Sequence, residues 1–226
     1  AHPDKYKALD ESTITKPSSL SKYFYRVLKD DYTPVFGFDV LSRLPNRPDI
    51  TWKLKDVTKR VLSLTPEKIN HDVLGLVFHK LIPQRLRKKV GAFYTNPEAA
   101  EMLAQLAINN PNTKVMDMAV GSGTLLVAAY HRKRELLEKV GQGFSSKDHH
   151  RFLEEELTGI DIMPFAGHLA VVHLSLQEPL YETEKVRIAV WDSTQLTPDS
   201  KIPPLSRELK EVYKQPTLDS YKEGKP

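Results

Sequence analysis

The chain has 226 residues, a formal net charge of +4 and no cysteine. Without cysteine it can form no disulfide, no thiolate nucleophile and no thiolate metal site. The small net charge is weak evidence for a nucleic-acid partner, and no apolar run approaches the roughly eighteen residues that a membrane-spanning helix requires. We therefore expect a cytoplasmic protein with no membrane contact, long enough for one or two small domains.

Residues 1–89 are predicted to form a helical N-terminal region. Apolar residues recur at helical spacing over residues 20–28, 54–62 and 73–81. A basic cluster ends this region and consists of Lys80, Arg85, Arg87, Lys88 and Lys89. Such a cluster can bind DNA phosphates with an affinity that falls with salt, and a solvated helix face is an equally good interpretation.

The next segment, Gly91-Ala92-Phe93-Tyr94-Thr95-Asn96-Pro97-Glu98, predicts the start of a helix that continues to residue 108. Asn96 is a suitable N-cap, Pro97 fits the first helical position and Glu98 suits the positive end of the helix. One interpretation is a well-formed helix start with two core aromatics. The other is the wall of a ligand site, in which ring faces pack a ligand and hydroxyl and N–H groups hold its carboxylate.

A glycine-rich turn follows a short β-prone run over residues 113–118 and precedes a helix predicted from residue 124 to about 140. The first N–H groups of that helix lack internal partners and, with Asp117 at the strand end, suit a ligand that has an amine and a carboxylate. A dinucleotide fold would require a third glycine where Leu126 stands, and a phosphate loop would require a lysine after the glycines. A tight turn of any α/β protein is the plain alternative.

Together these two segments resemble the adenine-specific DNA methyltransferases of type I restriction–modification systems. That family carries Gly-x-Phe/Tyr-Tyr/Phe-Thr-Pro shortly before Asp-Pro-Ala-x-Gly-Ser/Thr-Gly/Ala, and the resemblance covers residues 72–192. Asn96 and Met118 stand where the family usually has proline. The resemblance implies an α/β fold with a Rossmann-like S-adenosylmethionine-dependent methyltransferase sheet, incomplete in this chain, whose first half lies in residues 90–196. The residues it implies around S-adenosyl-L-methionine are Phe93, Tyr94, Thr95, Asp117, Ala119, Gly121, Ser122, Gly123 and Thr124.

Further along, the pattern predicts a loop over residues 142–150, a helical stretch over 151–156, a strand over 157–162, a helix over 164–176 and a strand over 186–193. By resemblance, Asp161 after the second strand would hold the ribose hydroxyls and Asp192 after the third would accept from the adenine amino group. A solvated strand-end acid is the alternative for Asp161.

Several other residues are interpreted as structural. His168 and His173 are expected to be helix-packing or surface residues, and Trp191 is expected in the core. The basic run at residues 132–134 is interpreted as ordinary surface.

The family's catalytic segment, Asn/Asp-Pro-Pro-Phe/Tyr, does not occur in this sequence. Pro203 and Pro204 form the one Pro-Pro pair, but it lacks both the amide and the aromatic ring and lies in residues 197–226, which read as a proline-rich loop or flexible tail. We therefore expect an N-terminal portion of a modification subunit with no catalytic residue of its own, inactive by itself, and requiring no metal.

The resemblance also implies the partners. They are double-stranded DNA and the specificity and restriction subunits of the same system. Two other functions remain open on the sequence: an S-adenosylmethionine-dependent methyltransferase acting on RNA or protein, and a non-catalytic module that binds the cofactor or DNA.

Overall fold

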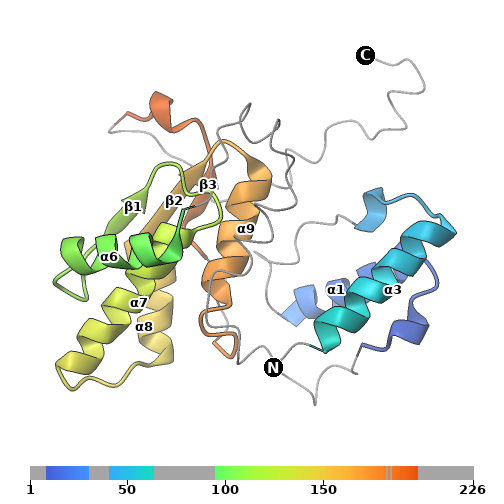
Figure 1. The fold of residues 1–226 in the computed structure, drawn as a ribbon, viewed down its shortest axis with the longest axis horizontal. Helices are drawn as coiled ribbons and strands as arrows, with labels where there is room; N and C mark the ends of the chain where they lie inside the picture. Colours follow the sequence, from blue (N-terminus) through green and yellow to red (C-terminus); the bar gives the residue numbers. More distant parts are fainter. Residues whose placement is uncertain (1–8, 31–40, 64–94, 182, 184, 198–226) are drawn as a thin grey trace. The chain divides into compact units, whose positions relative to one another are not determined.

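The computed structural model describes residues 9–30, 41–63, 95–181, 183 and 185–197 (Figure 1). The chain divides near residue 70 into two compact units. Within the described ranges, no helix combines the length and the apolar character needed to cross a bilayer.

The described part of the N-terminal unit is helical, as predicted. Its elements are the short 3-10 helix η1 (Glu11–Thr13), α1 (Pro17–Asp30), the 3-10 turn η2 (Leu41–Arg43) and α3 (Pro48–Leu62). Both long helices begin at a proline, which has no N–H to leave unpaired in a first turn. Ile14, Leu20 and Leu41 form the buried core of this unit. The predicted helix over residues 73–81 lies outside the described residues.

The second unit is the predicted α/β domain. Its elements are α6 (Pro97–Ala107), β1 (Val115–Asp117), α7 (Thr124–Lys139), α8 (Ser146–Arg151), η4 (Phe152–Glu156, a π-helical turn), β2 (Leu157–Asp161), α9 (Pro164–Ser175), β3 (Ile188–Val190) and η5 (Ser193–Gln195). The three strands are parallel in the order β1-β2-β3, with Asp117 beside Gly159 and Asp161 beside Val190. Parallel strands need crossover connections, and α7 and α9 supply them.

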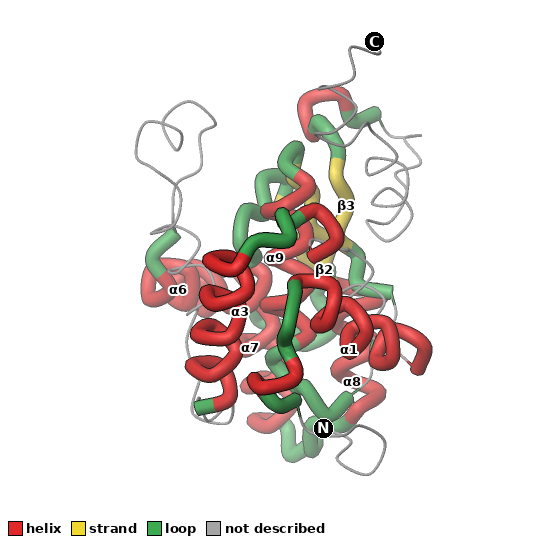
Figure 2. Tube along the Cα trace, turned by 90° about the vertical axis from the view of Figure 1, so that its right-hand side faces the viewer, coloured by secondary structure: helices red, strands yellow, loops and turns green. Residues whose placement is uncertain are grey.

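Helices α7 and α9 contact each other as well as the strands, so both cover one face of the sheet. Figure 2 shows β2 and β3 side by side with α9 next to them. The core of this unit is made of fully buried apolar side chains, among them Leu126, Ile160, Leu174 and Ile188. Gly159 in β2 is part of this packing, because a Cβ there would lie 2.6 Å from Cδ1 of Ile188.

The helix ends follow the sequence signals in most places. Asn96 caps α6 as predicted, because its Oδ1 accepts from the Ala99 N–H at 2.9 Å. At the other end of α7, Gly141 has φ +73° and donates to the Glu138 carbonyl while the Gln142 N–H reaches the Leu137 carbonyl. This is the Schellman arrangement that ends a helix at a left-handed glycine.

The loop predicted over residues 142–150 is wrong in its second half. Helix α8 starts there because Ser145 and Asp148 form a capping box, in which the Asp148 carboxylate accepts from the Ser145 N–H at 3.1 Å. This stretch reads as a loop because it is polar, but a helix of six residues forms there.

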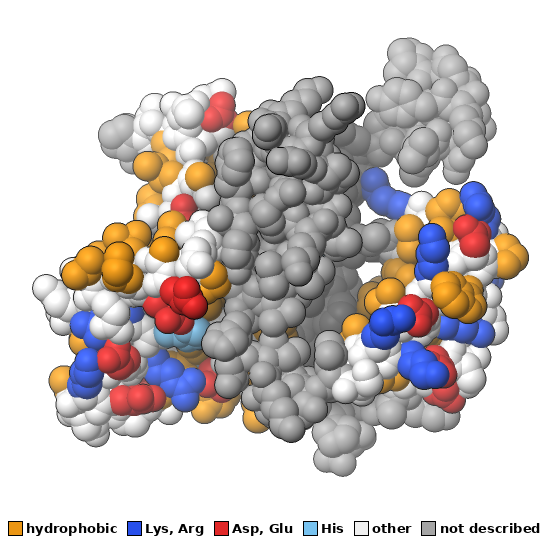
Figure 3. Space-filling view, in the orientation of Figure 1, with side chains coloured by type: hydrophobic (Ala, Val, Ile, Leu, Met, Phe, Trp, Pro, Cys, Tyr) orange, Lys and Arg blue, Asp and Glu red, His pale blue; other side chains and the backbone are white. Residues whose placement is uncertain are grey.

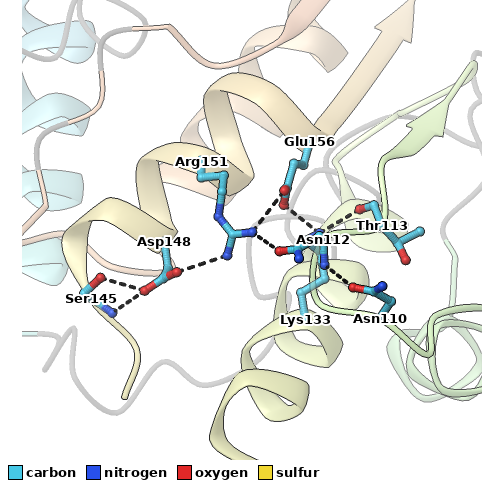
Figure 4. A network of polar contacts seen from close by, with 8 residues as sticks. All are labelled: Asn110, Asn112, Thr113, Lys133, Ser145, Asp148, Arg151 and Glu156. Atoms are coloured by element: carbon cyan, nitrogen blue, oxygen red, sulfur yellow. Dashed lines mark hydrogen bonds and ion pairs between the residues drawn. The ribbon is translucent and has the colours of Figure 1, made fainter. Parts of the chain in front are cut away.

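The interpretation of the 132–134 run as surface is wrong for Lys133, whose side chain is fully buried. Its Nζ lies 2.7 Å from Glu156 Oε2 and donates to the Thr113 carbonyl at 2.7 Å. Arg151 binds the other oxygen of Glu156 at 3.2 Å and Asp148 at 3.0 Å (Figure 4). This ionic network joins the middle of α7 to α8, to the end of η4 and to the segment before β1.

Candidate functional site

The three acidic residues predicted as ligand contacts follow the three strands at one edge of the sheet. Asp117 and Asp161 are the last residues of β1 and β2, and Asp192 comes two residues after β3. Because the strands are parallel, their carboxyl ends meet at the same edge, where open α/β sheets bind their ligands.

The glycine-rich turn lies at this edge between β1 and α7. Gly121 has φ +53° and Gly123 has φ +87°, backbone angles that side chains disfavour. The Gly123 N–H closes the turn on the Val120 carbonyl at 2.7 Å, and Gly123 is the N-cap residue of α7. A Cβ on Gly123 would also lie 3.2 Å from Cα and Cβ of Ala170. Both glycines are therefore required by conformation, and the second also by packing.

Asp161 connects this turn to the second strand. Its Oδ2 accepts from the Gly121 N–H at 2.9 Å and its Oδ1 accepts from the Met163 N–H at 2.8 Å. The residue is only 8% exposed, so it is not a solvated strand-end acid. An ionised carboxylate has about four acceptor positions, so these two bonds leave capacity for hydroxyl donors.

Asp117 lies close enough to Asp161 for the two charges to interact. Burial raises the pKa of Asp117, and the negative charge of Asp161 raises it further. The hydrogen bond that the Ala119 N–H donates to Asp117 Oδ1 at 3.0 Å has the opposite effect and lowers this pKa. Two carboxylates at one sheet edge, Asp161 buried and Asp117 half-buried, favour a ligand that brings positive charge.

Asp192 differs from the other two acids. Its Oδ1 accepts from the N–H and the hydroxyl of Thr194 at 3.0 and 2.7 Å, and its Oδ2 accepts from Gln195 Nε2 at 3.0 Å. These bonds, led by the Thr194 hydroxyl, lower its pKa. Asp192 therefore caps the η5 turn, and three of its roughly four acceptor positions are occupied locally.

The remaining predicted residues are distributed unevenly. Ser122 lies in the turn and Thr124 is the first residue of α7, and their hydroxyl oxygens are 3.1 Å apart. Ala119 and Thr95 are exposed. Phe93, Tyr94 and the basic residues Arg85, Arg87, Lys88 and Lys89 lie outside the described residues. The structure thus brings together the acids and the turn and leaves the aromatic pair and the basic cluster as predictions.

Three side chains near this edge were not expected to matter. His173 is 3% exposed and its Nδ1 lies 3.0 Å from the Ser122 carbonyl oxygen, a contact across 51 positions of sequence. Trp191 is 38% exposed, so its assignment to the core is wrong. Ile162, directly after Asp161, is an apolar side chain with 65% exposure. The one sequence signal for Ile162 and Trp191 was their position beside a strand-end acid.

A hollow of about 470 Å³ occurs in the N-terminal unit, and its lining residues all precede the strand-end acids and the glycine-rich turn in the sequence. Its lining residues are Thr15, Asn46, Arg47, Pro48, Thr51, Trp52 and Lys55. Figure 3 shows basic and apolar side chains mixed over this unit. No predicted site residue lines it.

Comparison with known proteins places these features in a family. The N-6 DNA methylase family model matches residues 69–211, more than half of the chain, whereas no curated protein matches the sequence significantly. A solved structure described as a modification subunit of a type I restriction enzyme from Vibrio vulnificus is 19% identical, with a TM-score of 0.43 over 66% of this chain and 30% of that one.

A nuclease-deletion mutant of the Type ISP restriction–modification enzyme LlaGI, in complex with a DNA substrate mimic, is 13% identical, with a TM-score of 0.46 over 90% of this chain and 19% of that one. The chain thus spans less than a third of either solved structure. From the extent of the family match, the chain belongs to the N-6 DNA methylase family.

Proposed function

We propose that this chain is the S-adenosylmethionine-binding part of a DNA adenine-N6 methyltransferase, the modification subunit of a type I restriction–modification system. The observation that carries the proposal is the bond from the Gly121 N–H to Asp161. It joins the glycine turn and a strand-end acid into one site in a member of the N-6 DNA methylase family.

The chemistry of the site fits this cofactor. S-adenosylmethionine has an amine, a carboxylate, a ribose and a positively charged sulfonium. Asp117 and Asp161 favour the positive groups, and the N–H groups of the first turn of α7 favour the carboxylate. Asp161 retains acceptor positions for the ribose hydroxyls, and Ile162 and Trp191 offer apolar surface for the adenine ring. Asp192 would meet the adenine amino group with its remaining acceptor position.

When bound, S-adenosylmethionine supplies an electrophilic methyl group. The described residues would bind and orient the donor and need no covalent nucleophile, because alignment is the main requirement of a methyl transfer. Phe93, Tyr94 and Thr95 would line the site around the methionine end of S-adenosylmethionine. No Asn/Asp-Pro-Pro-Phe/Tyr segment occurs in these 226 residues. We therefore assign no catalytic residue among them and expect them to bind the donor without transferring its methyl group.

The partners follow from the same proposal. We expect double-stranded DNA, a specificity subunit that selects the sequence, and a restriction subunit. Arg85, Arg87, Lys88 and Lys89 are the proposed phosphate contacts.

The proposal is tested by comparing two acids in calorimetric titrations with S-adenosylmethionine. Asp161→Ala should weaken binding at least about tenfold, roughly 1.4 kcal/mol, because it removes the ribose acceptor and the partner of the Gly121 N–H. Asp192→Ala should weaken it by less than about threefold, since that carboxylate is already engaged by its own turn. Circular dichroism and urea unfolding establish that each variant is folded. An unchanged dissociation constant for Asp161→Ala would remove Asp161 from the site.

A further inference from the structure

Helix α9 holds the glycine turn through two residues one helical turn apart, Ala170 and His173. Gly123 packs against Ala170 so closely that an added Cβ would be 3.2 Å from it. His173 is 3% exposed, with Nδ1 3.0 Å from the Ser122 carbonyl oxygen. A carbonyl oxygen can only accept, so Nδ1 carries the proton and donates it.

This hydrogen bond acts on a single peptide unit, the one between Ser122 and Gly123. Its carbonyl is held by His173, and its N–H is held by the Val120 carbonyl at 2.7 Å. Glycine has few steric limits on its backbone angles, so a turn with glycines at 121 and 123 has other conformations open to it. Fixing both ends of the peptide selects one of them.

The selected conformation determines where α7 begins. Gly123 is the N-cap residue of α7 with φ +87°, and the N–H groups of the first turn follow it directly. We infer that His173 is a positioning residue: through Nδ1–H it holds the Ser122 carbonyl and thereby presents the N-terminus of α7 to the methyl donor. The inference rests on the proposed function, because it assigns a role to His173 only through the turn that binds the cofactor.

A packing role alone makes a different prediction, and two substitutions separate the two roles. The amide nitrogen of asparagine lies the same number of bonds from Cα as Nδ1 of histidine, so His173→Asn keeps the donor. His173→Leu fills the space but removes the donor to the carbonyl of the half-buried Ser122. In titrations with S-adenosylmethionine, His173→Leu should weaken binding at least about tenfold, and His173→Asn should stay within about threefold of the unchanged protein.

A second buried histidine provides the matched control. His149 is fully buried and contacts Tyr130 and Thr183 at 2.7 and 3.0 Å, with no contact to the turn. His149→Leu should lower stability and leave the affinity for S-adenosylmethionine unchanged. If His173→Leu does not fold, His173→Gln replaces it, because glutamine carries its amide one bond too far to reproduce Nδ1.

Hydrogen exchange in the ligand-free protein tests the positioning separately from the cofactor. The amides of residues 121–124 should exchange faster in His173→Leu than in His173→Asn. If the unchanged protein does not bind S-adenosylmethionine, the proposed function fails, and this exchange difference still decides whether His173 fixes the turn. If the unchanged protein binds and the leucine and asparagine variants lose affinity equally, or neither loses any, the positioning role is overturned.

Discussion

The Glu156→Gln substitution is expected to lower the free energy of unfolding by about 3 kcal/mol. Glutamine keeps the shape of Glu156 but removes the negative charge between Lys133 and Arg151 (Figure 4). Breaking a buried ion pair costs roughly 3–5 kcal/mol, because one charge is left buried without compensation. We expect the lower end, since Lys133 keeps the Thr113 carbonyl at 2.7 Å and the ring of Phe152 at 4.8 Å.

Urea unfolding measures this loss, provided that the slope of the transition is unchanged. Lys133→Met combined with Glu156→Gln should cost less than the sum of the single changes, with a coupling of about 1–3 kcal/mol. Glu138→Gln on the same helix is the control: Glu138 is 56% exposed in its pair with Arg134, so its loss should stay below about 1 kcal/mol. A loss below about 1 kcal/mol for Glu156→Gln, with additive single changes, would refute the buried pair.

Three further predictions follow from other parts of the chain. Burial, with the nearby charge of His150, lowers the pKa of His149 to about 4, so the unfolded chain binds a proton that the folded protein does not. Stability should therefore fall by up to about 3 kcal/mol as the pH drops from 6.5 to 4; His149→Gln should flatten that dependence in thermal unfolding, and His150→Gln, which removes only the smaller cause of the lowered pKa, should flatten it less. Gly159→Ala should cost about 1–3 kcal/mol in urea unfolding through overpacking, and an unchanged midpoint would contradict the packing described for β2. Replacing Lys88 and Lys89 by glutamate should lower DNA affinity and flatten its salt dependence, and an unchanged salt slope in binding titrations would leave both as plain surface.

Local signals in the sequence predicted the elements that place the site. The cap at Asn96, the glycines at 121 and 123 and the acids that end β1 and β2 each depend on residues a few positions apart. Hydrophobic patterning then gave the alternation of strands and helices and with it the parallel sheet. These features could be predicted from the sequence because the residues that cause each of them lie in the same short segment.

Contacts between segments that are distant in the sequence could not be predicted in this way. Lys133 reads as surface beside Arg132 and Arg134, and its burial depends on Glu156 after another helix has intervened. His173 reads as helix packing until α9 brings it to Ser122. Asp192 accepts hydrogen bonds from its own turn, including one from the Thr194 hydroxyl. The pattern of a strand ending in an acid did not predict these bonds. The sequence therefore predicted which side chains carry useful chemistry, but it did not predict which residues they contact in the folded protein.

We propose that the turn at residues 121–124 and Asp161 together form a site for S-adenosylmethionine. Calorimetric titration of the unchanged protein with S-adenosylmethionine, and separately with NAD and with ATP, tests it most directly. We expect saturable binding of S-adenosylmethionine at one site and weaker binding of the other two. Preferential binding of NAD or ATP, or no binding of S-adenosylmethionine, would contradict it.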